Sequence, residues 1–170
     1  MASLRGERVV LRPGTDDDLD ALEAIFASPE VSRWWHSFDR ARIEADVLHG
    51  DDPADSVYVI DVDGQVAGII QSYEEEDPDY RSAGIDISVA REWHGTGVAL
   101  DALRTLARHL IEDRGHHRLT IDPNAANGRA IAAYTKLGFR PVGVMRRYER
   151  AADGTWHDGL LMDLLADELQ

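Results

Sequence analysis

The sequence from Ala83 to Gly97 reads AGIDISVAREWHGTG, and the run VALDALRTLARHLI follows it from Val98 to Ile111. Apolar and polar residues alternate in the first half of this stretch, which predicts a strand with Asp86 on its polar face. The apolar residues of the later run recur at helical spacing, which predicts an amphipathic helix that ends near Gly115. The Gly-Thr-Gly turn between them opens directly into the helix, so the first helical N–H groups have no partner within it and suit a phosphate.

The rest of the chain alternates between strand and helix patterns. We predict further strands at 8–13, 57–62, 66–73, 118–122, 139–146 and 155–164, and further helices at 16–27, 40–48 and 126–137. The Asp-Gly pair between the second and third of these strands is typical of an antiparallel hairpin. We expect an α/β (α+β) fold with a single mixed, mostly antiparallel sheet and helices on both faces. The length of 170 residues predicts a single domain, 1–170.

Composition restricts the possible partners. The formal net charge is −14, from 32 acidic and 18 basic residues, which argues against nucleic acid and anionic membranes and favours a cationic substrate. The alternative, with equal weight, is that the acidic residues only keep the protein soluble and bind no cationic substrate. The chain has no cysteine, so disulfides, thiolate nucleophiles and cysteine-bound zinc are excluded. The pair His116-His117 has no further ligand at metal spacing and is interpreted as the rim of a strand, so we predict no metal.

Targeting signals are not evident. Met1 to Val10 lacks an apolar segment of signal-peptide length, and no later run approaches the length of a membrane span. We therefore expect a cytoplasmic protein, either a monomer or a homodimer.

A second motif lies downstream. Asp122-Pro123 ends a predicted strand and precedes the pattern N-x-x-A-x-x-x-Y-x-x-x-G-F, which runs from Asn127 to Phe139. Together with the glycine turn, it resembles the Gcn5-related N-acetyltransferases, which bind acetyl-CoA and release CoA. Their first motif opens with Gln or Arg, where this chain has Glu92. The resemblance implies a splayed central strand pair that holds acetyl-CoA, with the pyrophosphate on the glycine turn.

The implied cofactor-binding residues come from the two motifs and the end of the central strand. They are Ser88, Val89, Ala90, His94, Gly95, Thr96, Gly97, Val98, Ala99, Asn127, Ala130 and Tyr134. Asn127 either hydrogen-bonds the pantetheine or caps its own helix. A backbone N–H near residues 88–90 is the natural donor to the thioester carbonyl.

Four separated matches are closer to the aminoglycoside 6'-N-acetyltransferases. They are the V-x-x-W-W pattern of 31–35, the segment 67–73, the Gly-Ile-Asp of 84–86 and the Asp-Pro of 122–123. This resemblance implies that the acceptor is an aminoglycoside 6'-amine, as in antibiotic resistance. The segment 154–160 is similar instead to N-terminal acetyltransferases of ribosomal proteins. Peptide N-termini, polyamines and siderophore lysines are therefore alternative acceptors, and a CoA-binding module without catalysis is the alternative outside enzymes.

Acceptor residues follow from charge and aromatic content. Two adjacent tryptophans on a helix cannot both face one core, so we expect at least one of them to line a groove. The acidic run after Tyr73 connects the hairpin to the central strand, and we expect it to border a cleft that binds ammonium groups. The candidate substrate-binding residues are Trp34, Trp35, Tyr73, Glu74, Glu75, Glu76, Asp77, Asp79, Asp86 and Asp122.

Catalysis requires a carboxylate, because the acceptor amine arrives mostly protonated. Asp86 is the candidate that holds the ammonium and takes its proton, directly or through a water molecule; a salt bridge to Arg81 is the structural alternative. Asp122 is a second carboxylate candidate or simply the start of a turn. By its motif, Tyr134 would protonate the leaving thiolate, and ordinary helix packing is the alternative.

Overall fold

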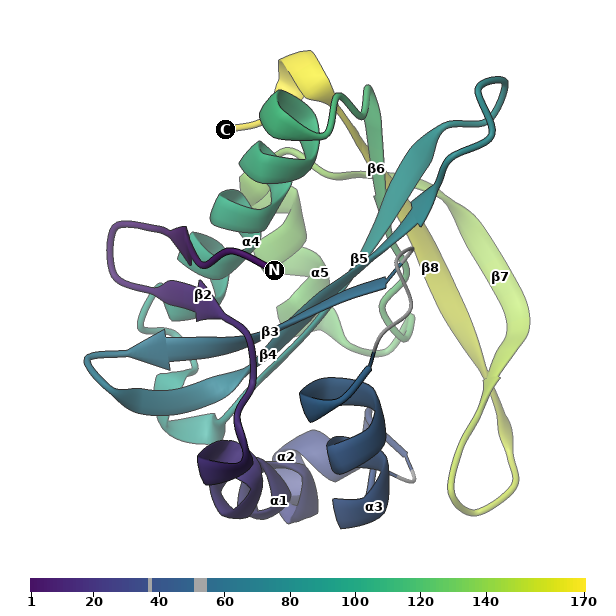
Figure 1. Ribbon diagram of the computed structural model, residues 1–170. Helices are drawn as coiled ribbons and strands as arrows, with labels where there is room; N and C mark the ends of the chain where they lie inside the picture. The colour runs from purple at the N-terminus through teal and green to yellow at the C-terminus, as the bar shows by residue number, and fades with distance from the viewer. Residues whose placement is uncertain (37, 51–54) are drawn as a thin grey trace.

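The computed structural model describes residues 1–36, 38–50 and 55–170. Its strands form one sheet of eight in the order β1-β2-β3-β4-β5-β6-β8-β7 (Figure 1). All neighbouring strands are antiparallel except β5 and β6. The predicted mixed, mostly antiparallel sheet is confirmed.

The strands are β1 (Leu4–Arg5), β2 (Val10–Arg12), β3 (Asp55–Val62), β4 (Gln65–Glu75), β5 (Ser82–Val89), β6 (Arg118–Ile121), β7 (Arg140–Arg150) and β8 (Trp156–Leu165). The helices are α1 (Leu19–Ala27), α2 (Pro29–Ser32), α3 (Arg40–Arg42) with its π-helical continuation η2 (Ile43–Leu48), α4 (Val98–Arg108) with its continuation η4 (His109–Asp113), and α5 (Gly128–Leu137). Single 3-10 turns are η1 (Asp16–Asp18), η3 (Arg91–Trp93) and η5 (Ala166–Glu168).

Helices cover both faces of the sheet, as predicted (Figure 1). Successive side chains of a strand point to opposite faces, so each strand contributes to two cores. Val59 and Ile69 belong to the buried cluster that contains the apolar residues of α1 and η2. Their neighbours Ile60 and Ile70 belong to the cluster that contains those of α4 and α5. The sheet thus separates two layers of helices.

Strands β5 and β6 separate after a short parallel contact. They pair only through Ala83 with Leu119 and Gly84 with Thr120, although β5 continues to Val89. On its other edge β5 pairs with β4 from Ser82 to Val89. The edge of β5 after Gly84 therefore faces a gap. Asp86 lies two residues beyond Gly84, the last residue of β5 that pairs with β6. The predicted splayed central pair is confirmed.

Three elements differ from the prediction. The acidic run was expected to interrupt strand character after Tyr73, but β4 continues through Glu75 because Glu74 pairs with Ala83 and Glu75 with Ser82. Strand β7 extends to Arg150, with irregular pairing to β8 between Met145 and Glu149. The two-residue strand β1 is too short for a period to reveal it.

Candidate active site

The glycine turn has the backbone shape that its glycines permit. Gly95 and Gly97 have φ angles of 74° and 91°, in the left-handed region. The Thr96 hydroxyl donates to the Trp93 carbonyl at 2.7 Å, which closes the turn. Helix α4 begins at Val98, so the N–H groups of Val98 and Ala99 have no carbonyl partner within the helix. The turn is therefore suited to bind the oxygens of a phosphate.

His94 joins the two sides of the gap. Its Nδ1 lies 2.8 Å from Nη1 of Arg129 on α5, and its Nε2 lies 2.9 Å from the Val89 carbonyl oxygen. Arginine only donates, so Nδ1 accepts and Nε2 carries the proton that it donates to Val89. His94 thus links the two elements, with Nε2 hydrogen-bonded to the end of β5 and Nδ1 hydrogen-bonded to the first turn of α5.

The main chain at the end of β5 offers one N–H to the gap. The Ala90 N–H donates to the Ala67 carbonyl of β4 at 2.8 Å, so it is not free for a ligand. Successive N–H groups of a strand point to opposite edges, so the N–H of Ser88 also points toward β4 and that of Val89 points away from it. Of the segment 88–90, Val89 is therefore the donor that faces the gap.

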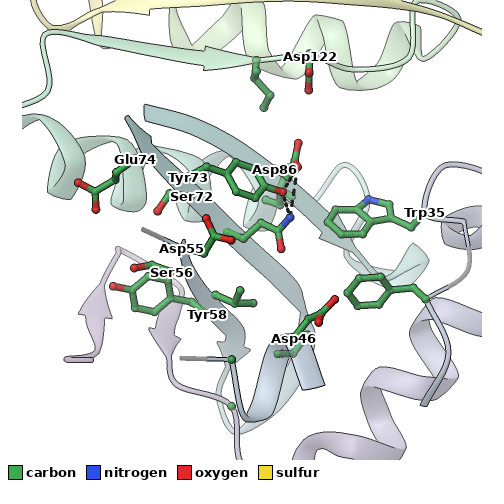
Figure 2. Close-up of a pocket in the computed structure, with 18 of the residues that line it drawn as sticks. Trp35, Asp46, Asp55, Ser56, Tyr58, Ser72, Tyr73, Glu74, Asp86 and Asp122 are labelled. Atoms are coloured by element: carbon green, nitrogen blue, oxygen red, sulfur yellow. Dashed lines mark hydrogen bonds between the residues drawn. The ribbon is translucent and has the colours of Figure 1, made fainter. Parts of the chain in front are cut away.

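A cleft of about 1240 Å³ opens beside the gap (Figure 2). Its lining includes the aromatic and acidic residues Trp34, Trp35, Tyr73, Tyr134, Tyr148, Glu74, Asp86, Asp122 and Glu149. The residues just named come from the segment after α2, from β4, β5 and β7, from the position after β6 and from α5, and β3 and η2 contribute further lining. The fold therefore gathers these residues from segments far apart in the sequence.

Asp86 has one engaged and one open oxygen. The Tyr73 hydroxyl donates to Asp86 Oδ2 at 2.6 Å, and the Gln71 amide lies 3.4 Å from the same oxygen (Figure 2). Burial and the Asp86 charge raise the pKa of Tyr73, so Tyr73 stays a donor. Among the described residues, none donates to Oδ1. The alternative salt bridge is not formed, because the Arg81 guanidinium donates to the Arg114 carbonyl at 2.6 Å.

Asp122 lies across the gap from Asp86, directly after β6. The Tyr148 hydroxyl donates to its Oδ2 at 2.5 Å. Burial raises the pKa of Asp122 despite this hydrogen bond, and the nearby charge of Asp86 adds to the shift. The hydrogen bond to Asp122 also raises the pKa of Tyr148 to about 12. The two carboxylates thus form two similar tyrosine–aspartate pairs at the same opening.

Tyr148 and Glu149 are site residues that sequence reasoning missed. They lie on β7, whose pairing with β8 shifts between Met145 and Glu149. Arg147 in this bulge has a φ of 53°, unusual for a residue other than glycine. A bulge changes which side chains face the cleft, and strand alternation in the sequence does not reveal it.

Tyr134 reaches the same cleft from α5. It is 7% exposed, and burial, with smaller contributions from Asp86 and Asp122, raises the pKa of its hydroxyl. Its hydroxyl has no hydrogen-bond partner within the part of the chain that the structure describes. Tyr134 is thus a protonated donor that lines the cleft. Asn127 also lines the cleft, and its side chain caps α5 by accepting the Ala130 N–H at 3.3 Å.

Both tryptophans line the cleft, which confirms that at least one borders a groove. The Trp35 ring packs edge-on against Phe26 and Phe38, with centroids 5.6 and 5.4 Å away. The Arg33 guanidinium lies 5.0 Å from the centroid of Trp34. Trp35 therefore belongs both to the core of the helical layer and to the cleft.

The acidic run is placed differently from the expectation. Glu74 lines the cleft, but it points to the sheet face opposite Tyr73 and accepts hydrogen bonds from His116 at 2.7 Å and Arg114 at 3.1 Å. Burial raises the pKa of Glu74, but these two hydrogen bonds outweigh it and hold the pKa below its usual value. His116 is 1% exposed, so its interpretation as a strand rim is wrong.

The other acids of the run do not line the cleft. Glu75 ends β4, and Glu76, Asp77 and Asp79 follow it in the connection to β5. The pairing of β4 with β5 explains this position, because Asp86 pairs with Gln71, several residues before the turn. Within the described residues, no group of acidic and histidine side chains is arranged to hold a metal ion.

Comparison with known proteins agrees with this geometry. The family model described as Acetyltransferase (GNAT) domain matches residues 8–140. The chain belongs to the GNAT acetyltransferase family. It is therefore an acyltransferase that uses acetyl-CoA, and the splayed strands and the glycine turn fit that group. None of the helices in the described ranges combines the length and apolar composition that a membrane crossing requires.

The names of similar proteins give different acceptor amines. The chain is 30% identical over 157 residues to the aminoglycoside N(6')-acetyltransferase type 1 of Klebsiella pneumoniae, covering 82% of this chain and 77% of that protein. It is 26% identical over 158 residues to the spermidine N(1)-acetyltransferase of Escherichia coli K12, covering 91% of this chain and 84% of that protein.

Solved structures have the same fold. The aminoglycoside acetyltransferase AAC(6')-Ib in complex with coenzyme A has a TM-score of 0.76 at 25% identity, covering 94% of this chain and 96% of that one. Mycobacterium smegmatis RimJ in complex with CoA-disulfide has a TM-score of 0.81 at 27% identity, covering 99% and 88%.

Proposed function

We propose that this acetyltransferase acetylates a primary amine of a polycationic small molecule, and that its acceptor is the 6'-amine of an aminoglycoside. The open Oδ1 of Asp86, at the point where β5 and β6 separate, is the observation that carries the proposal. A carboxylate at this position binds an ammonium group beside the gap that the family uses for acetyl-CoA. The 30% identity to the aminoglycoside enzyme supports the acceptor class.

Asp86 has two tasks in this proposal. It holds the ammonium at Oδ1 and takes its proton, directly or through a water molecule, so that the neutral amine becomes a nucleophile. Tyr73 is a positioning residue, because its hydroxyl fixes Oδ2 and leaves Oδ1 toward the cleft. Asp122 adds a second carboxyl group across the gap, which favours an acceptor with more than one ammonium.

Bound acetyl-CoA supplies an acetyl thioester, and the chain supplies donors on both sides of it. The Val89 N–H faces the gap and is placed to stabilise negative charge that develops on the carbonyl oxygen. The Tyr134 hydroxyl is protonated and open to the cleft, and it donates a proton to the departing sulfur. The Gly95–Gly97 turn and the first N–H groups of α4 bind the pyrophosphate.

The walls of the cleft suit a sugar ring. Trp34 and Trp35 offer apolar ring surfaces, and Tyr73 and Tyr148 lie beside the two aspartates. Aromatic faces bind the apolar faces of sugars and attract nearby ammonium groups. Spermidine is the second candidate, since a pair of carboxylates also suits a linear polyamine and the spermidine enzyme is similar over most of its length.

A CoA-release assay separates these acceptors. The panel contains kanamycin, gentamicin, spermidine, lysine derivatives and N-terminal peptides, and mass spectrometry locates the acetyl group on the product. We expect kanamycin to gain one acetyl group at its 6'-amine, and analogues blocked at that amine to be inert. Strong turnover of peptides with none of aminoglycosides would overturn the proposal.

A further inference from the structure

Arg8 brings a positive charge to the glycine turn from the opposite end of the sequence. Its Nη1 donates a hydrogen bond to the Thr96 carbonyl. The same nitrogen lies 3.5 Å from the position that a Cβ on Gly97 would occupy. The guanidinium therefore sits against the turn that precedes α4, with four of its five N–H groups not used by that bond.

A buried carboxylate fixes the main chain around Arg8. Asp101 on α4 is 6% exposed and accepts the N–H groups of Glu7 at 3.1 Å, Arg8 at 2.7 Å and Val9 at 3.0 Å. The Asp101 N–H in turn donates to the Gly97 carbonyl at 3.0 Å. The turn, the first helical turn and the backbone of Arg8 thus form one hydrogen-bonded unit.

Of two other arginines near the turn, Arg91 is paired with a carboxylate and Arg129 is hydrogen-bonded to a histidine. The Arg91 guanidinium is paired with Glu30 at 2.7 Å, and the Arg129 guanidinium contacts His94 at 2.8 Å. At the position where the family motif has Gln or Arg, this chain has the acidic Glu92. Arg8 forms no ion pair with any carboxylate in the described part of the chain. Its charge is therefore available to an anion at the turn.

We propose that Arg8 binds a phosphate at the nucleotide end of CoA, either the pyrophosphate or the 3'-phosphate, and so supplies the positive charge that Glu92 does not. The inference rests on the proposed placement of the pyrophosphate at the glycine turn. A guanidinium is suited to this role because it stays charged and presents several donors to phosphate oxygens.

Calorimetric titration of the full-length protein with CoA tests the proposal without an acceptor. Arg8→Gln keeps a polar side chain at this position but removes the charge and the terminal N–H groups that reach the turn. Because the substitution removes a charge-assisted hydrogen bond to phosphate, we expect the Kd for CoA to rise at least about 10-fold. Arg5→Gln on β1 is the matched control for loss of one charge, and its Kd should stay within about 2-fold of wild type.

Truncated ligands identify which phosphate is bound. If the loss persists with dephospho-CoA, Arg8 contacts the pyrophosphate; if it disappears, Arg8 contacts the 3'-phosphate. Binding of pantetheine, measured by competition, should be the same in Arg8→Gln and wild type. Unchanged affinity for CoA, or an equal loss for pantetheine, would overturn the inference. Failure of the wild type to bind CoA would instead reject the cofactor site itself.

Discussion

Replacing Asp86 by asparagine tests the central step of the proposed reaction. The substitution preserves the shape of the side chain but removes the charge that holds the ammonium at Oδ1. An ammonium and a carboxylate 4 Å apart attract by about 4 kcal/mol at an effective dielectric constant of about 20. Since about 1.4 kcal/mol corresponds to a tenfold change, we expect kcat/KM for the amine to fall about 10³-fold.

The assay pairs CoA release with calorimetry. Steady-state release of CoA gives kcat/KM for kanamycin, and titration gives the Kd for CoA. The Kd should change less than about 3-fold, because in the proposed reaction Asp86 contacts the acceptor and not CoA. Asp167→Asn is the matched control, since Asp167 is an exposed aspartate in the C-terminal turn η5. If Asp86→Asn retains kcat/KM within about 5-fold of wild type, or weakens CoA binding as much as turnover, the assignment of Asp86 is wrong.

Three further changes test other parts of the site and the fold. Tyr134→Phe should lower kcat about 10-fold to 1000-fold in the CoA-release assay with little change in Kd for CoA, because the buried hydroxyl is a protonated donor; an unchanged kcat would mean that another group protonates the sulfur. Gly97→Val should abolish CoA binding by calorimetry, whereas Gly64→Val, at a φ of 82° in the β3–β4 turn, imposes a similar backbone strain and should leave binding intact; equal loss in both would refute a local role of the turn. Glu74→Gln should lower the free energy of unfolding by about 2 kcal/mol at pH 7, because it weakens the hydrogen bond to the buried His116 and removes the ion pair with the more exposed Arg114. Since the folded-state pKa of Glu74 is lowered, this stability is present above about pH 4.5 and is lost as the pH falls through the folded pKa, so thermal melts should show the difference shrinking at lower pH.

The sequence by itself determined most of the elements and the family, and it indicated where the cofactor side of the site lies. Alternation over 83–90, helical spacing after Gly97 and the Asp-Gly hairpin each depend on residues that are close in sequence, so local patterns were sufficient to predict them. Confirmed predictions include the helical segment 40–48, the mixed sheet and its helices on both faces. The family also followed from two short motifs, because a glycine turn and a helix start are local structures.

Only the tertiary structure decided which distant groups meet. The register of β4 on β5 places Asp86 opposite Gln71 and carries Glu75, Glu76, Asp77 and Asp79 past the cleft, which no local pattern indicates.

The remaining partners join segments that are far apart along the chain. Tyr148 reaches Asp122 through a bulge in β7. His116 is buried against Glu74 although its neighbour His117 is exposed. Arg8 meets Thr96 because a buried aspartate on α4 holds the start of the chain. Contacts of this kind depend on strand register and packing, which a one-dimensional pattern does not contain.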